Sequence, residues 1–353
     1  MKITNSVYFY QGLQSGIHSW SNSIVINGKK RILIDPGSNM KYHLKDLVGA
    51  MNEDGIDISK IDEIWLTHAH PDHAGSAGTL IKQFNIKKLR CHFKAGGFLS
   101  SSAVTKKFLI YFTKEVVRGK KIVRTPFFWR KALLKILISL PRRIFDVVLW
   151  FLVFGMEKIW GKWLPVFNLE VFDEEEIIEN QPDIQILFLP GHAPEEIGFW
   201  LKDEKVLIIG DLINTGYNRE IIPALVTPQS NFGDALFSIK KMSNLPVEIL
   251  IPAHGFFLRN KEMIGRIFEK IISRMEKHQK MVKEEVEKNP RLKYELDELS
   301  KIVLYDLPLI ISHSEKKQYL VAICDNLGYY NNKNNKTTKS SDNFVGALFF
   351  VIL

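Results

Sequence analysis

Three histidines and one aspartate lie within six consecutive positions, 68 to 73, of a stretch that reads THAHPDHAG from Thr67 to Gly75. Imidazole nitrogens are ligands that suit Zn²⁺, and a carboxylate adds a negatively charged oxygen. Because the whole chain has only 10 histidines, neither packing nor a histidine-rich surface turn explains this concentration. The spacing predicts a metal site whose first ligands are His68, His70, Asp72 and His73.

The elements around this stretch explain how its residues could reach metal ions. The apolar run Ile61–Leu66 predicts a strand that leads into the cluster. Residues i and i+2 of an extended chain face the same side, so His68 and His70 can reach one metal together. Pro71 suits the first turn of a helix, and the Asp72–His73 pair would then open that helix. One short loop could therefore hold one metal and begin a second site.

Four further segments place a single polar residue at the end of an expected strand. Taken alone, a histidine or aspartate at a strand end is more often a structural residue, a helix cap or part of a turn. The cluster at 68–73 makes a shared metal site the better interpretation. The segments are LIDPG with Asp35, LPGH with His192, IGD with Asp211 and PAHG with His254.

The pattern HxHxDH after a strand that ends in threonine resembles the metal-binding signature of the metallo-β-lactamase-fold hydrolases. The four further segments follow in the order of that family, and the resemblance covers about residues 5–260. It implies three groups of ligands and one supporting residue: His68, His70 and His192 for the first metal, Asp72, His73 and His254 for the second, Asp211 as the bridge, and Asp35, which orients the loop without binding metal.

The resemblance implies an α/β (α+β) fold, a four-layer αββα sandwich of metallo-β-lactamase type. Runs of β-branched and aromatic residues predict strands, and apolar residues at helical spacing predict helices. The expected strands are 6–12, 22–27, 31–35, 62–67, 184–189, 198–201, 206–209 and 247–251, with helices at 42–51 and 233–242. We expect a hydrolase domain over residues 1–260 and a C-terminal helical cap over residues 261–353.

A basic and aromatic insertion at about residues 97–165 departs from a minimal version of that family. It holds 14 lysines and arginines against three acidic residues, so its net charge of +11 exceeds the +9 of the whole chain. Pro141-Arg142-Arg143 divides its apolar run, and neither part reaches the ~18 to 20 residues that span a bilayer. We expect a helical lid or a contact in a homodimer. Peripheral membrane contact through residues 106–163 and nucleic-acid binding are the alternatives.

The C-terminal part predicts helices at 260–289, 296–307 and 316–326, followed by a flexible loop at 331–341. His278 and His313 are expected at the surface. Cys91 and Cys324 provide no disulfide framework and suit a reducing interior. The N-terminus lacks the pattern of a signal peptide, so the expected compartment is the cytoplasm, with attachment to the inner membrane surface as the alternative.

The implied chemistry is hydrolysis by a metal-activated water. Two cations about 3.5 to 4 Å apart lower the pKa of a water that they share, so no serine, cysteine or lysine nucleophile is required. We expect two zinc ions per chain, with iron or manganese as alternatives, and Asp72 and Asp211 as the catalytic carboxylates. Ala69 stands where the diiron oxidoreductases of the family carry glutamate, and this argues against that branch. The lack of a cysteine ligand between His192 and His254 argues against most true β-lactamases.

The expected reaction is cleavage of an ester-like bond, a thioester or a lactone, in a small acyl or lipophilic substrate. One alternative is a phosphodiesterase or ribonuclease acting on RNA or phospholipid headgroups, which the basic insertion would attract. Another is a non-catalytic membrane-surface binding protein on the same fold. A binding scaffold has no reason to keep seven metal-compatible residues, which argues against the last alternative.

Overall fold

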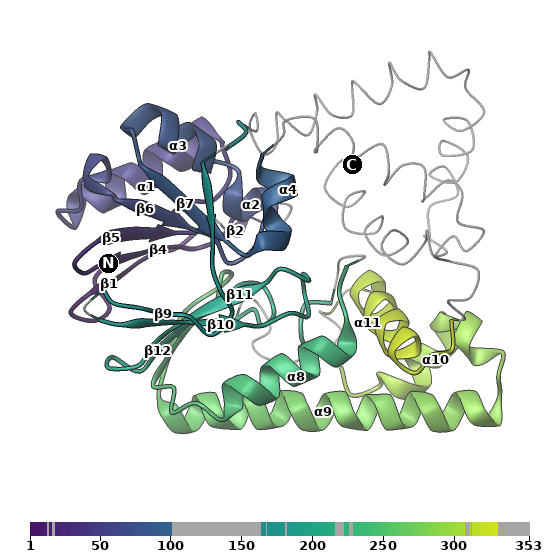
Figure 1. The fold of residues 1–353 in the computed structure, drawn as a ribbon. Helices are drawn as coiled ribbons and strands as arrows, with labels where there is room; N and C mark the ends of the chain where they lie inside the picture. Colours follow the sequence, from purple (N-terminus) through teal and green to yellow (C-terminus); the bar gives the residue numbers. More distant parts are fainter. Residues whose placement is uncertain are drawn as a thin grey trace, which may run out of the picture.

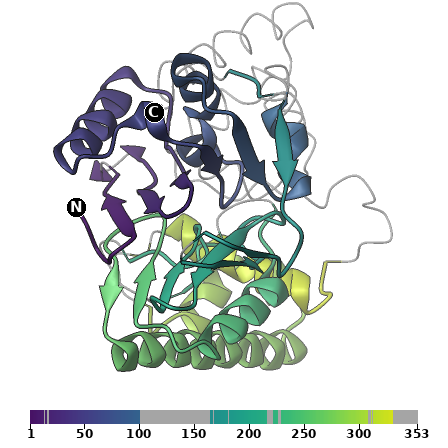
Figure 2. The same cartoon turned by 60° about the vertical axis from the view of Figure 1, so that its left-hand side comes forward.

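Two six-stranded sheets lie face to face, with helices on both outer faces, in the computed structural model of the chain (Figures 1 and 2). The structure describes residues 1–12, 14–15, 18–100, 164–166, 168–180, 182–215, 222–225, 229–307, 311 and 313–330. The predicted αββα sandwich is confirmed.

The first sheet has the strand order β1-β4-β5-β6-β7-β8. Its strands are β1 (Val7–Tyr10), β4 (Ser23–Asn27), β5 (Arg31–Ile34), β6 (Glu63–Trp65), β7 (Lys88–Cys91) and β8 (Leu169–Val171). A small hairpin, β2 (Gln14–Ser15) and β3 (His18–Ser19), precedes β4. The strands from β5 to β8 are parallel, so their carboxyl ends lie at one edge of the sheet.

The second sheet has the strand order β14-β13-β12-β11-β10-β9. Its strands are β9 (Ile177–Ile178), β10 (Ile184–Phe188), β11 (Ile197–Leu201), β12 (Val206–Ile208), β13 (Ile249–Ile251) and β14 (Leu258–Arg259). β12 is parallel to β13, and β11 is antiparallel to both β10 and β12. The carboxyl ends of β10, β12 and β13 therefore lie at the same edge, which collects the loops that follow them.

Apolar side chains from the facing sides of the two sheets form one buried cluster. Ile24 of β4 is the partner of Ile34 of β5, and Phe199 of β11 is the partner of Ile208 of β12. The ring of Trp65 lies 5.4 Å from the ring of Phe199, which joins the two layers. Because side chains alternate along a strand, every second residue of these strands enters this layer.

Helices cover both outer faces of the sandwich (Figure 1). The first sheet carries α1 (Lys41–Glu53) and α3 (Ala77–Phe84), and the second carries α8 (Phe232–Ser243) and α9 (Lys261–Lys288). The side chain of Asn260 caps α9 by accepting from the backbone N–H of Met263 at 2.9 Å. Pro290 follows the end of that helix, as the sequence predicts.

The helices α10 (Leu296–Val303) and α11 (His313–Asn326) pack against α8 and α9. One buried cluster continues from Leu207 of the second sheet through Phe268 of α9 to Leu320 of α11. The prediction that His278 lies at the surface is wrong, because α9 turns it into this packed layer, where its Nε2 lies 2.9 Å from Asp306 Oδ1. The division of the chain at residue 260 stays a prediction.

The predicted insertion joins the short helix α4 (Gly96–Leu99) to β8. Residues 101–163, including the expected lid and membrane contact, lie outside the described residues, as does the expected loop at 331–341. The two ends of the insertion meet, since the backbone N–H of Val166 donates to the carbonyl of Leu99 at 2.8 Å. No helix within the described ranges combines the length and the hydropathy that a membrane span requires.

Candidate metal centre

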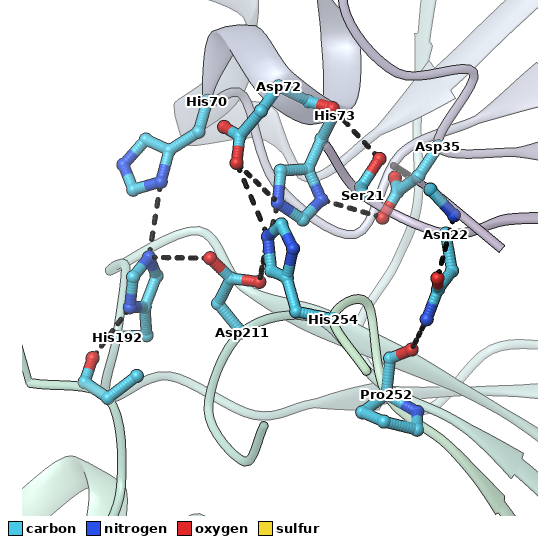
Figure 3. A network of polar contacts seen from close by, with 12 residues as sticks. Ser21, Asn22, Asp35, His70, Asp72, His73, His192, Asp211, Pro252 and His254 are labelled. Carbon is cyan, nitrogen blue, oxygen red and sulfur yellow. Dashed lines mark hydrogen bonds and ion pairs between the residues drawn. The ribbon is translucent and has the colours of Figure 1, made fainter. Parts of the chain in front are cut away.

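All seven predicted metal ligands meet where strand ends from the two sheets face each other. Figure 3 shows this place and labels every ligand except His68. The first sheet contributes four of them: His68 and His70 follow β6, and Asp72 and His73 lie in the short helix α2 (Pro71–Ala74). The second sheet contributes one ligand after each of three strands: His192 after β10, Asp211 after β12 and His254 after β13. The site therefore requires both sheets.

The first group consists of His68, His70, His192 and Asp211, whose ligand atoms all lie within 4.8 Å of one another. His70 Nδ1 lies 2.9 Å from His68 Nε2 and 3.1 Å from His192 Nε2. Asp211 Oδ2 lies 3.5 Å from His192 Nε2. Tetrahedral zinc, with Zn–N distances of about 2.0 to 2.1 Å, would set such nitrogens roughly 3.3 Å apart. The arrangement has the size of a four-coordinate site.

Hydrogen bonds on the far side of two rings determine which nitrogen faces the centre. His192 Nδ1 donates to the carbonyl of Ala224 at 2.6 Å, and His68 Nδ1 donates to the hydroxyl of Thr67 at 3.1 Å. With their ring protons held there, both histidines direct the lone pair of Nε2 toward His70. A cation placed between these nitrogens would accept both lone pairs.

The second group consists of Asp72, His73, Asp211 and His254. His254 Nε2 lies 3.3 Å from Asp72 Oδ2 and 3.2 Å from Asp211 Oδ1. His73 Nε2 lies 3.4 Å from the same oxygen of Asp211. Asp211 thus directs Oδ2 toward the first group and Oδ1 toward the second, as a bridging carboxylate does.

Asp35 stands behind this ligand loop and supports it. Its Oδ1 accepts from the backbone N–H of Thr67 at 2.9 Å, and its Oδ2 accepts from the Thr67 hydroxyl at 2.6 Å. The same Oδ2 lies 2.9 Å from His73 Nδ1. Asp35 belongs to neither ligand group, which agrees with the orienting role that the resemblance implies.

Burial and charge act differently on the two groups. Burial, together with the neighbouring His192, lowers the pKa of His70 to about 3, so this imidazole is neutral and free to ligate. At His254, burial opposes the charged form, but Asp211 and Asp72 outweigh it and raise the pKa to about 9. Burial also opposes the Asp211 carboxylate, yet the surrounding histidines hold its pKa well below the ordinary value. The carboxylates of the second group thus stabilise a positive charge beside them, and a bound metal ion would supply that charge.

Two buried atoms at the centre show how well a metal would fit. Among the described residues, His73 Nε2 and Asp211 Oδ1 have no hydrogen-bond partner, although they lie 3.4 Å apart. Burying polar atoms without partners costs free energy, and ligation would satisfy both. Imidazoles combined with carboxylates suit zinc and other first-row divalent ions.

Two polar residues that the sequence did not single out hold ligand loops next to the centre, and the second of them joins the two sheets (Figure 3). The hydroxyl of Ser21 donates to the carbonyl of Asp72 at 2.8 Å. Asn22 Nδ2 donates to the carbonyls of Pro252 and Gly255, at 2.9 Å and 3.0 Å, and so holds the loop of the last ligand. In the sequence these two residues are marked only by their position just before β4. Many loop residues precede a strand, so that position does not identify them.

A comparison with known protein families shows to which family this chain belongs. The sequence profile of the metallo-beta-lactamase superfamily matches residues 21–254, more than half of the chain. The chain belongs to the metallo-beta-lactamase superfamily. The match begins at Ser21 and ends at His254, so all seven predicted ligands lie within the part of the chain that carries the superfamily pattern. The recognition made from the sequence is confirmed, while the role of each ligand stays a prediction.

Solved structures of the superfamily show the same fold. A metallo-beta-lactamase family protein from Thermus thermophilus aligns with a TM-score of 0.58 at 18% identity, over 92% of this chain and 93% of its own. A beta-lactamase domain protein from Burkholderia ambifaria aligns with a TM-score of 0.58 at 13% identity, over 93% and 88%. A superfamily protein from Sulfolobus tokodaii aligns with a TM-score of 0.50 at 17% identity, over 77% and 86%. At these identities the likeness concerns the fold alone.

Proposed function

We propose that this superfamily member is a hydrolase with a dinuclear metal centre, and that the metal is zinc, with iron or manganese as alternatives. The observation that carries the proposal is the position of Asp211. Its Oδ2 lies 3.5 Å from His192 Nε2, and its Oδ1 lies 3.2 Å from His254 Nε2. One carboxylate that serves both groups favours two metal ions with a common ligand over a single isolated ion.

The chain's own residues would position the reactants. When bound, two metal ions at such a centre lower the pKa of an attacking water and neutralise charge on the oxygen of the attacked bond. Asp211 and Asp72 both have pKa values below the ordinary range, because neighbouring histidines outweigh the effect of burial. Both are therefore carboxylates at neutral pH and can accept a hydrogen bond from the water and orient it.

For the substrate, we propose an ester-like bond, a thioester or a lactone, in a small acyl or lipophilic molecule. The large apolar side chains of the insertion support a lipophilic substrate. Its net charge of +11 supports a second candidate, a phosphodiesterase acting on RNA or phospholipid headgroups. We further propose that the protein works in the cytoplasm, since Cys91 and Cys324 are buried and form no disulfide.

The test combines metal content with hydrolysis. Purified wild type is compared with His70→Ala, Asp211→Ala and the control His313→Ala, because the side chain of His313 is 59% exposed and belongs to neither ligand group. Metal per chain is measured by mass spectrometry, and thioester, lactone and bis-phosphodiester panels are assayed on the same samples. We expect about two zinc ions per wild-type chain, with metal and activity reduced in the two ligand variants and unchanged in the control.

The outcomes separate the candidates. Turnover of thioesters or lactones supports the proposed reaction, whereas turnover of bis-phosphodiesters alone replaces it with the phosphodiesterase. Wild type that binds two metals without hydrolysing any panel member would indicate a binding role. Wild type that binds one iron or no metal would overturn the dinuclear hydrolase.

A further inference from the structure

Two glutamates follow the ligand His192 on the loop between β10 and β11 and are almost completely buried. Glu195 is 2% exposed and Glu196 is 1% exposed. Burying a carboxyl group is costly unless its oxygens find hydrogen-bond donors. Neither glutamate belongs to a ligand group, so their burial calls for a different explanation. Each one contacts the backbone of a different ligand loop.

Glu196 contacts the loop that carries Asp211. Its Oε1 accepts from the backbone N–H of Leu212 at 2.9 Å. On the other side of Asp211, a Cβ placed on Gly210 would lie only 2.5 Å from the same oxygen. The carboxyl group therefore packs against the backbone on both sides of the bridging ligand, and only glycine at position 210 permits that approach.

Glu195 contacts the loop that carries His68 and His70. Its buried carboxyl group faces the backbone N–H of Ala69, which lies between those two ligands and opposes the rise in the pKa of Glu195 that burial causes. The same pair of loops is joined a second time, because the backbone N–H of Ile197 donates to the carbonyl of Thr67 at 2.9 Å. The loop after β10 therefore holds a loop of the first sheet directly behind its ligands.

We propose that Glu195 and Glu196 are positioning residues, which use the loop of His192 to hold the loops of its partner ligands at the distance that the metals require. The first metal takes its ligands from three separate loops on two sheets, and small errors in their separation would weaken it. Two adjacent carboxyl groups hold the other two loops, one each. The inference rests on the metal centre of the proposed function and is independent of its substrate.

The two residues should affect the two metals differently. Glu195 supports only the segment with His68 and His70, so its loss should weaken the first metal more than the second. Glu196 supports Asp211, which both groups share, so its loss should weaken both metals. If Glu195 contributed only to folding, its loss would not weaken the affinity for the first metal more than the affinity for the second.

The experiment replaces each glutamate by leucine, which fills a similar volume without an acceptor, and by glutamine, which keeps an acceptor oxygen. Stepwise zinc affinity is measured by competition with a chromophoric chelator, and thermal unfolding is followed on the metal-free protein. We expect a loss of about 10- to 100-fold in affinity for the leucine variants. The glutamine variants should recover most of it. Glu63→Leu is the matched control, since Glu63 is 3% exposed, bonds Lys30 and Trp65, and belongs to neither ligand group.

Gly210→Ala tests the Glu196 contact from the loop of Asp211, because its methyl group would displace the Glu196 carboxyl group. It replaces Glu196→Leu in the experiment if that variant fails to fold. It should lower zinc affinity by itself, and combining it with Glu196→Leu should add little, because both changes remove one contact. Wild-type affinity in the leucine variants, or glutamine variants as weak as leucine variants, would overturn the inference while leaving the proposed function intact. Wild type that binds no zinc would instead defeat the proposed function itself.

Discussion

Asp35 Oδ2 lies 2.9 Å from His73 Nδ1, and this contact turns the other ring nitrogen of His73 toward the metal centre. The same carboxylate also accepts twice from Thr67, the residue just before the first ligand. Asp35 has a φ of +48°, a conformation that residues other than glycine, asparagine and aspartate seldom adopt. Aspartate is thus one of the few residue types that suit this backbone conformation, and its side chain here can orient the segments that carry ligands of both metals.

Asp35→Asn should weaken metal binding without removing a ligand. The amide keeps one acceptor oxygen but places an NH₂ group where either Oδ1 or Oδ2 stood, so at least one of the three hydrogen bonds is lost. We expect zinc affinity to fall by about 10- to 100-fold, as measured by chelator competition. Asp62→Asn is a suitable control, because the carboxylate of Asp62 accepts from Arg31 at an exposed position. Equal affinities in Asp35→Asn and wild type would show that Asp35 does not orient the ligands.

His254→Ala should remove one metal and spare the other. His254 belongs only to the second group, whereas Asp211 belongs to both. Mass spectrometry should therefore find about one zinc in His254→Ala and less than one in Asp211→Ala, as expected for a centre with two ions and a shared ligand. Loss of both ions from His254→Ala would mean that the two groups are not separable sites.

Asn22→Ala should destabilise the sandwich by removing a contact between its two sheets. The carboxamide donates to two buried carbonyls, of Pro252 and Gly255, and accepts from the backbone N–H of Gly12 at 3.0 Å. Buried groups left without partners cost about 1 to 3 kcal/mol, so the free energy of unfolding should fall by about that amount in urea titrations. Asn168→Ala, which loses one exposed bond to the carbonyl of Lys87, should change it far less. Equal losses in both variants would contradict this role.

His278 should make the protein sensitive to mild acid. Burial lowers its pKa, although Asp306 opposes that shift. Because the folded value lies below the unfolded value of about 6.5, the unfolded chain binds more protons between the two. The stability contributed by neutral His278 is thus complete above about pH 6.5 and is lost as pH falls toward the folded value.

The measurement for His278 is thermal unfolding at about pH 7.5 and about pH 5, on either side of the unfolded pKa. His278→Gln cannot titrate, so its Tm should fall less than that of wild type over this interval. His313→Gln, at an exposed position, should behave as wild type does. A His278→Gln variant with the full wild-type pH dependence would show that this histidine does not contribute to it.

Arg142 and Arg143 should matter if the insertion contacts an anionic membrane. Vesicles that contain anionic phospholipid would be floated with wild type and with Arg142→Gln/Arg143→Gln. At about 1 kcal/mol for each cation near such a surface, binding should weaken about 30-fold. The matched control is Lys280→Gln/Lys283→Gln on α9, which removes the same charge elsewhere. Equal weakening in both variants would indicate a response to net charge alone, and retention of RNA in place of vesicles would favour the nucleic-acid alternative.

The ligand cluster could be predicted from the sequence because its geometry is local. His68, His70 and the start of α2 lie within one loop, so strand alternation and the preference of proline for a first helical turn are sufficient. The three ligands of the second sheet have no such local signature. Only the order of segments that the superfamily shares identifies them, and the structure shows why that order matters, since each follows a strand that ends at the same edge.

Other features could not be predicted because they depend on distant contacts. Asn22 and Pro252 are 230 positions apart, and Glu196 meets Leu212 only after β11 and β12 have paired. The strand β14 is two residues long, too short for any periodicity. His278 is different, because it lies between the buried Met275 and Val282 at helical spacing. A prediction based on the helical spacing of His278, and not on its polarity, would have placed it on the buried face of α9.

The bond between Val166 and Leu99 has a consequence for how this protein could have acquired its long insertion. Because Leu99 and Val166 meet beside the paired strands β7 and β8, we expect the segment between them to tolerate changes in length and sequence without disturbing that pairing. We expect that lengthening, shortening or exchanging that segment would leave the ligand loops in place. If the insertion contacts the substrate, as proposed, recognition could then change during evolution without moving the metal ligands.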